Sequence, residues 1–171
     1  LEGLNRMELS RIRIGDDAIR CLASAITTDA FQRMMTLELT DCGFGNAGLT
    51  ALCRSMGHMR CLVELNLSSN AIDDRGMVAI VSSQLNNLLK LVVDNNRVSD
   101  DGLKQVVCCI ASKTSALSQL QSISLFDNPI SPSSSWAFFC IVERIGALEN
   151  LVTFCADGVR VRMCLSTPKF I

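Results

Sequence analysis

Apolar and polar positions along this chain follow one phrase that recurs over most of its length. The clearest copy, LVELNLSSNAIDD at 62–74, has the form LxxLxLxxNxIxD. Alternating apolar and polar residues predict a short strand, and apolar residues at helical spacing after the phrase predict a helix. A phrase that returns at a nearly fixed interval indicates a solenoid, in which each unit buries its apolar side by stacking on the next.

Five copies align on this phrase, and a degenerate sixth begins near 148. Their first anchors are 30, 28, 26 and 32 residues apart and are Leu4, Met34, Leu62, Leu88 and Leu120. A strand and its turn use about half of such a unit, which leaves room for a helix of roughly three turns. The sequence therefore predicts one α/β domain over 1–171, with about five full repeats starting near 4, 34, 62, 88 and 120 and a C-terminal cap at 148–171. The strands should be parallel and the helices should form an outer wall.

Two polar positions in each copy have expected structural roles. The Asn anchor, such as Asn70, should lie in the turn after the strand and satisfy unpaired backbone groups, with Cys42 as a small buried substitute in the second copy. The second position lies where each helix should begin, where a short acceptor side chain can cap the unpaired N–H groups. It is held by Asp16, Asn46, Asp74 and Asp100, and in the fifth copy by Ser131 before Pro132.

The repeats resemble those of a known family over roughly residues 4 to 145. The residues that carry the resemblance are Leu37, Leu39, Cys42, Phe44 and Gly48 in the second copy and Leu65, Leu67, Asn70, Ile72 and Gly76 in the third. On these residues the chain resembles the long-repeat, ribonuclease-inhibitor-like subfamily of leucine-rich repeat proteins. The resemblance implies a horseshoe-shaped solenoid with a parallel sheet on the concave side and α-helices on the convex side. It also implies that another protein binds the concave face or the adjacent loops.

Composition changes this picture little. The chain has 171 residues, of which 49% are hydrophobic, and it contains no apolar run of the roughly 18 residues that a membrane span requires. Because it opens at Leu1 directly on a repeat, we expect it to be a fragment of a longer protein. The nine cysteines form no CxxC pair, so we expect reduced thiols, no zinc site and a cytoplasmic or otherwise intracellular protein.

Catalytic signals are weak in this sequence. It has no glycine-rich phosphate loop, its one histidine, His58, falls in a loop after the second helix, and we expect neither an enzyme nor a cofactor or metal. Ran GTPase activators resemble this architecture, so GTPase activation is a less favoured alternative. Arg11, Arg13, Arg75 and Arg97 lie in suitable loops, but no match to that family's functional residues can be drawn.

The strand residues between the anchors should face the concave side. Six acidic and three basic residues among them leave a charge of about −3, which disfavours nucleic acid and favours a partner protein with a basic surface. Toward the C-terminus Val92, Phe126 and Phe154 replace polar residues, as in an interface hot spot. The predicted binding residues are Glu38, Asp41, Glu64, Asn66, Lys90, Val92, Asp94, Asn95, Phe126 and Asp127. We expect no membrane contact and no small-molecule ligand, and a structural scaffold subunit of a large intracellular assembly remains the alternative.

The chain leaves the repeat after residue 151. The segment 152–163 alternates apolar and polar residues and predicts an edge strand or a hairpin closed around Asp157 and Gly158. Such an end would cap the last layer of the core, with Arg160 and Arg162 on one side of the strand.

Overall fold

Strands and helices alternate along the chain, as the repeat predicts. The computed structural model describes residues 4–112, 117–144, 153–156 and 159–162. Its strands are β1 (Arg6–Ser10), β2 (Thr36–Thr40), β3 (Glu64–Asn66), β4 (Lys90–Val92), β5 (Ser122–Leu125), β6 (Thr153–Ala156) and β7 (Val159–Arg162). Its helices are α1 (Gly15–Ile26), α2 (Asn46–Ser55), α3 (Asp74–Val81), α4 (Asp100–Ser112) and α5 (Pro132–Arg144), with short 3₁₀ turns η1 (Asp29–Phe31) and η2 (Met56–His58).

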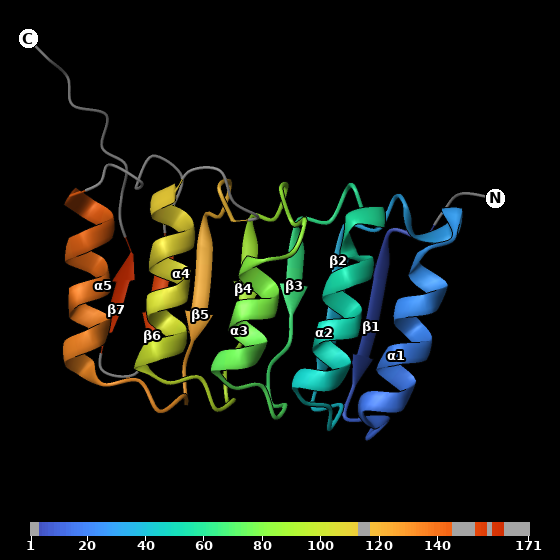
Figure 1. Ribbon diagram of the computed structural model, residues 1–171, viewed down its shortest axis with the longest axis horizontal. Helices are drawn as coiled ribbons and strands as arrows, with labels where there is room; N and C mark the ends of the chain where they lie inside the picture. The colour runs from blue at the N-terminus through green and yellow to red at the C-terminus, as the bar shows by residue number, and fades with distance from the viewer. Residues whose placement is uncertain (1–3, 113–116, 145–152, 157–158, 163–171) are drawn as a thin grey trace, which may run out of the picture.

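The seven strands form one sheet in chain order, and the first six are parallel. The helices stand side by side over one face of this sheet, with α1 and α5 at opposite ends of the row (Figure 1). This arrangement confirms the predicted α/β solenoid. We call the face of the sheet away from the helices the open face; it corresponds to the concave face of the expected horseshoe.

At the C-terminal end, β6 and β7 pair in the antiparallel sense, which confirms the predicted hairpin. The turn at Asp157 and Gly158 lies outside the described residues, as do 148–152 and 163–171 of the predicted cap and the side chains of Phe154, Arg160 and Arg162.

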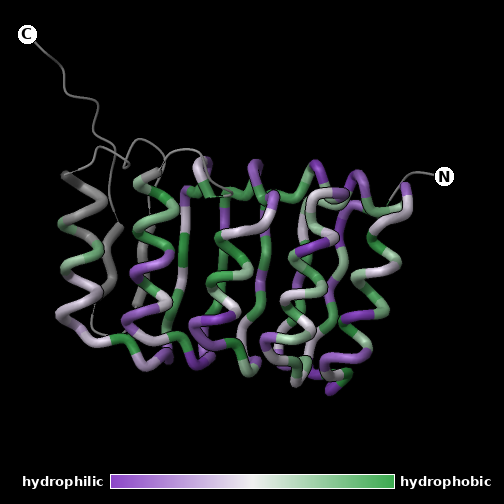
Figure 2. Tube along the Cα trace, viewed as in Figure 1, coloured by the Kyte–Doolittle hydropathy of each residue, from purple (hydrophilic) through white to green (hydrophobic). Residues whose placement is uncertain are grey.

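The core is a column of anchor side chains stacked from strand to strand. Met7, Leu37, Leu65, Leu91 and Ile123 occupy one row of the register, and the last four are at most 1% exposed. Hydrophobic and hydrophilic residues are interspersed along the strands and helices from β1 to α4 (Figure 2). Stacking thus removes the anchors from water, which is the main favourable contribution to folding.

The first repeat departs from the prediction. Leu4 and Ile12 were expected as core anchors but are 42% and 49% exposed. The reason is geometric: β1 is the first strand of the sheet and has a neighbouring repeat on one side only.

The predicted role of the Asn anchor is confirmed. Asn96 accepts a hydrogen bond from the N–H of Ile72 in the preceding repeat (3.1 Å) and donates to the carbonyls of Leu67, Val93 and Asp94 (3.0–3.1 Å). Asn70 and Asn128 repeat this pattern. In the second repeat, Cys42 is buried, and its thiol donates weakly to the Leu9 carbonyl at 3.3 Å. The same side chains therefore close their own turn and join two repeats.

The predicted helix cap is confirmed in the fifth repeat, where the Ser131 hydroxyl accepts from the N–H of Ser134 in the first turn of α5 at 3.2 Å, but the caps predicted in the other repeats need a correction. Helices do begin at Asn46, Asp74 and Asp100, but these side chains do not cap their own helices; α3, for example, is capped by Asp73, which accepts from the N–H of Arg75. The side chains of Asn46, Asp74 and Asp100 instead accept hydrogen bonds from residues at the start of the helix in the next repeat. The carboxylate of Asp74 accepts from the N–H of Ser99 (2.7 Å), the hydroxyl of Ser99 (2.6 Å) and the N–H of Gly102 (3.1 Å). We call these contacts relay caps.

Relay caps recur along the row of helices. Asp16 accepts from the N–H groups of Gly45 and Gly48, Asn46 from that of Asp73, and Asp100 from the N–H and hydroxyl of Ser131. The N–H of Ser131 is the main cause that lowers the pKa of Asp100. Parallel stacking places each helix start beside the following one, which is why a cap can act one repeat away.

The relay cap explains a glycine in the first turn of three helices. A Cβ added at Gly48, Gly76 or Gly102 would lie 2.5–2.7 Å from the oxygen of Asp16, Asn46 or Asp74 respectively. Only a residue without a side chain leaves room for the capping oxygen.

Candidate functional site

The open face carries the residues that the sequence predicts to bind a partner. The strand register aligns one row through Arg6, Thr36, Glu64, Lys90 and Ser122, and a second row two residues further along each strand. The second row runs through Glu8, Glu38, Asn66, Val92 and Ser124. Five of the ten predicted residues thus lie side by side on β2 to β4, and the other five follow at the ends of β2, β4 and β5.

Most charges on the two rows are paired across neighbouring strands. A guanidinium nitrogen of Arg6 lies 2.7 Å from a carboxylate oxygen of Glu38 and 3.3 Å from one of Glu8. The Lys90 ammonium lies 3.9 Å from the Glu64 carboxylate. Asp41, Asp94 and Asp127 take part in none of these three ion pairs. These three carboxylates thus lie beyond the ends of β2, β4 and β5, outside the two rows.

The strand ends share one backbone conformation. One residue within the first three positions after each of the first five strands has a positive φ of 51–59°, and these residues are Arg11, Asp41, Ser69, Asn95 and Asp127. Asp and Asn tolerate this left-handed region better than most residues. Except for Ser69 they are exposed, so the turn presents a row of side chains along one edge of the open face.

Phe126 and Asp94 belong to the same edge. Asp94 accepts a hydrogen bond from the backbone N–H of Phe126 at 2.8 Å, and Asn95 donates its backbone N–H to the Phe126 carbonyl at 2.7 Å. Phe126 is partly buried. One carboxylate of the predicted site therefore also fixes the turn that carries the aromatic ring.

A small hollow lies on the open face between β2 and β4. It has a volume of about 90 Å³ and is lined by Glu38, Glu64, Leu65, Asn66, Lys90 and Val92. Sites for drug-sized molecules have volumes of about 300 Å³ or more. The shape of this hollow suits contact with the surface of another macromolecule better than capture of a small ligand.

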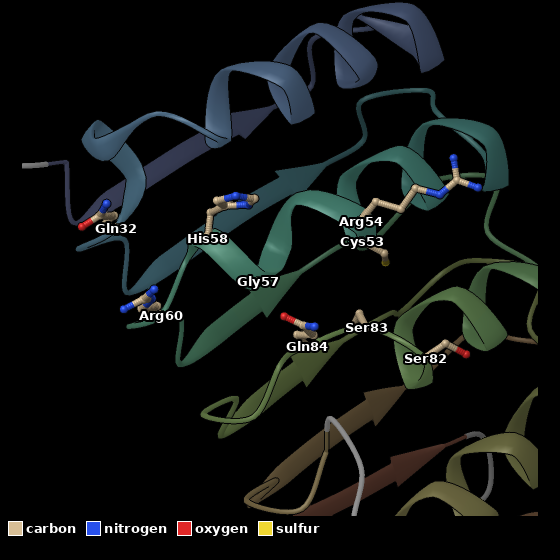
Figure 3. Close-up of a pocket in the computed structure, with 9 residues that line it drawn as sticks. All are labelled: Gln32, Cys53, Arg54, Gly57, His58, Arg60, Ser82, Ser83 and Gln84. Carbon is tan, nitrogen blue, oxygen red and sulfur yellow. The ribbon is translucent and has the colours of Figure 1, made fainter.

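Sequence reasoning missed a second feature at the C-terminal ends of α2 and α3. Two adjoining hollows of about 370 and 360 Å³ share Gly57, Arg60 and Gln84 and together form what we call the rim groove. Figure 3 shows the residues that line the first of them. His58, predicted as an exposed loop residue, is exposed and lines this groove. One sequence signal could have indicated this groove: the third repeat is the shortest, with 26 residues between its first anchor and the next, which leaves fewer residues for its helix.

The buried thiols and the possible metal ligands of the described residues do not add a further site. Burial raises the pKa of the Cys53 thiol to about 12, and burial, followed by the charge of Asp41, raises that of Cys42. Within the part of the chain that the structure describes, no cluster of three or more His, Cys, Asp or Glu side chains could hold a metal ion. Among those same residues, no helix combines the length and apolar character needed to cross a membrane.

Comparison with known proteins places the repeats in a family. A family profile described as "Leucine Rich repeat" matches residues 33–53, 58–81 and 84–106. Nucleotide-binding oligomerization domain-containing protein 2 of Bos taurus is 32% identical over 94 residues, which are 55% of this chain and 9% of that protein. NACHT, LRR and PYD domains-containing protein 12 of Mus musculus is 28% identical over 104 residues, or 59% of this chain and 10% of that protein.

A third relative is named as a linker protein. Capping protein, Arp2/3 and myosin-I linker protein 3 of Rattus norvegicus is 28% identical over 87 residues, or 51% of this chain and 6% of that protein. The chain therefore spans a tenth or less of the length of these relatives. The matching profile and the strand-and-helix solenoid agree, so residues 33–53, 58–81 and 84–106 are leucine-rich repeats, and the same alternation of strand and helix continues on both sides of them.

Proposed function

We propose that this chain is a non-catalytic protein-binding module whose partner docks on the open face and its adjacent turns. The observation that carries the proposal is the alternation of side chains along each strand. The anchors are buried in the core, whereas the residues between them lie on the open face and differ from repeat to repeat. Leucine-rich repeats are typically interaction modules, which agrees with this division.

The proposed contact surface comprises the ten residues predicted from the sequence. Its strongest part is the edge formed by Asp94, Asn95, Phe126 and Asp127, with Asp41 further along the same edge. A partly buried aromatic ring among polar and acidic groups has the composition of an interface hot spot. Because the carboxylates of Asp41 and Asp127 are exposed there, a basic partner surface would complement this edge.

Two finer assignments belong to the same proposal. We assign the chain to the ribonuclease-inhibitor-like subfamily, because full α-helices of 8–13 residues fill the convex part of each repeat. We also place it inside the cell, since its seven described cysteines are all free thiols, which reducing compartments maintain.

A permanent scaffold subunit is the second candidate. It is favoured by the relative named as a linker of capping protein, Arp2/3 and myosin-I, although only 6% of that protein is covered. GTPase activation ranks third, because none of the exposed loop arginines is matched to a functional residue of that class.

The proposal is tested by quantitative affinity capture with two matched variants. Asp41→Asn combined with Asp127→Asn removes two charges but keeps side chains that tolerate a positive φ. Lys104→Ala combined with Gln105→Ala changes two exposed positions on α4, on the covered side of the sheet. We expect the first variant to lose its main partner about tenfold or more and the second to keep it. Equal retention by both variants would remove the basis of the proposal.

A further inference from the structure

The rim groove exists because neighbouring helices have unequal lengths. Helix α2 has ten residues and continues into the three residues of η2, whereas α3 has eight and ends at Val81. The chain after α3, from Ser82 to Asn87, therefore runs beside η2 where a longer helix would otherwise pack. A step between two stacked repeats leaves a channel open to solvent.

The walls of the channel come from both repeats. Cys53, Arg54, Gly57, His58 and Arg60 line it from α2, η2 and the loop that follows, and Ser82, Ser83, Gln84, Asn86 and Asn87 line it from the loop after α3. Asn87 donates to the Arg60 carbonyl at 2.8 Å and ties the two walls together. The shape is therefore fixed by a direct contact between repeats.

The charge of the groove is one-sided. Arg54 and Arg60 are both exposed, and none of the residues that line the two hollows is Asp or Glu. Among the described residues neither guanidinium forms an ion pair, in contrast to Arg6 and Arg20, which pair with carboxylates. In Figure 3 Arg54 and Arg60 lie toward opposite ends of the groove, with His58 and Gln84 between them.

The remaining groups suit a peptide backbone. The side chains of Gln84, Asn86 and Asn87 each offer a donor and an acceptor, which an extended chain can use in turn. The Nδ1 atom of His58 lies 3.1 Å from the carbonyl oxygen of Ser55. Because a carbonyl oxygen can only accept a hydrogen bond, Nδ1 carries the proton in this contact. Pockets for small molecules are mostly apolar and enclosed, whereas this one is polar and open along its length.

We propose that the rim groove binds an extended acidic peptide segment of another protein, with two of its carboxylates on Arg54 and Arg60 and its backbone on the amide side chains of the loop after α3. A guanidinium group binds a carboxylate through two parallel N–H donors. The distance between Arg54 and Arg60 should therefore favour peptides whose acidic residues have a matching spacing. The groove and the open face are different surfaces, and this proposal does not depend on partner binding at the open face.

The test is fluorescence anisotropy with a labelled peptide of about eight residues, roughly 26 Å long when extended, in which Glu and Asp alternate. A second peptide carries Gln and Asn at the same positions. Arg54→Glu combined with Arg60→Glu reverses both charges of the groove. The matched control, Arg75→Glu combined with Arg97→Glu, makes the same change at two exposed arginines at the opposite ends of the helices.

We expect the acidic peptide to bind the unmodified chain at least about tenfold more tightly than its amide analogue, and the groove variant to lose this preference. The control variant should stay within about threefold, since distant charges are screened within about 8 Å at physiological salt. A Gly57→Ala variant, whose methyl group would displace the Gln84 side chain 2.5 Å away, should weaken binding without changing charge.

Three outcomes would overturn the proposal. One is equal weakening in the groove and control variants, which would indicate a general charge effect. Another is complete displacement of the peptide by inorganic phosphate at equal ionic strength, which would indicate an anion site without peptide recognition. The last is loss of peptide binding in the Asp41→Asn and Asp127→Asn variant, which would place the contact on the open face.

Discussion

The relay cap of Asp74 leads to a prediction about where a mutation acts. Asp74→Ala removes the acceptor of three hydrogen bonds, which come from the N–H and hydroxyl of Ser99 and the N–H of Gly102 at 2.6–3.1 Å. A hydrogen bond to a charged group contributes about 1.5–3 kcal/mol, and loss of a helix cap costs about 0.5–2 kcal/mol. Because Asp74 is only partly buried, we expect a total loss of about 2–3 kcal/mol in the free energy of unfolding.

Urea and thermal denaturation followed by circular dichroism measure this loss, which corresponds to a Tm lower by about 4–10 °C for a chain of this size. Asp74→Asn keeps one acceptor oxygen and should cost about half as much. Asp101→Ala is the matched control, since among the described residues its exposed side chain accepts a hydrogen bond only from the exposed Lys104 ammonium, and it should shift the urea midpoint far less than Asp74→Ala.

Amide hydrogen exchange then locates the effect. The N–H groups of Ser99 and Gly102, at the start of α4, should exchange faster in Asp74→Ala, while the N–H of Arg75, held by Asp73, should be unchanged. If Arg75 lost protection and Gly102 kept it, Asp74 would be an ordinary cap of α3 and the relay would be refuted.

Three further predictions concern single positions. Gly102→Ala should destabilise the chain by about 1–3 kcal/mol in urea denaturation, because the new methyl group would lie 2.5 Å from the Asp74 oxygen and 2.7 Å from Val98. Arg11→Gly should raise the free energy of unfolding by about 0.5–1 kcal/mol, since Arg11 has a φ of 59° that glycine adopts without strain. The Cys53 thiol should resist alkylation at pH 8 far longer than the exposed thiols, because burial raises its pKa to about 12. The pKa of Cys53 in the folded protein lies above its value of about 8.5 in the unfolded chain. The free energy of unfolding in urea should therefore be unaffected by this group below about pH 8.5 and should fall as the pH rises from about 8.5 toward 12.

The sequence predicts features that repeat within one unit. Leu65 and Asn70 could be assigned to core and turn because their spacing returns in each copy, and the hairpin at 153–162 follows from simple alternation. Contacts between units could not be predicted in this way. The ion pair of Arg6 with Glu38 and the reach of Asp74 to Gly102 join residues 32 and 28 positions apart, and both depend on the register of stacking.

The rim groove was missed for a related reason. It results from a difference in length between two neighbouring helices, whereas an alignment of repeats emphasises what they share. The candidate residues of the open face were found because alternation alone assigns a strand residue to one face of a sheet. The partial burial of Phe126 depends on the turn that Asp94 organises, which alternation does not describe.

The relay caps also define the unit in which this protein can be lengthened or shortened. At the three joints between α1 and α4, the start of one helix supplies an acceptor and the start of the next supplies a glycine, so a break between Asp74 and Gly102 would separate a matched pair. At the joint between α4 and α5, Asp100 faces Ser131 instead. A whole repeat from the first part of the chain can be duplicated or removed with these pairs intact if the new joint still sets an acidic or amide side chain against a glycine. Joining repeats with two bulky side chains at that joint should fail, even where the leucine phrase is in perfect register.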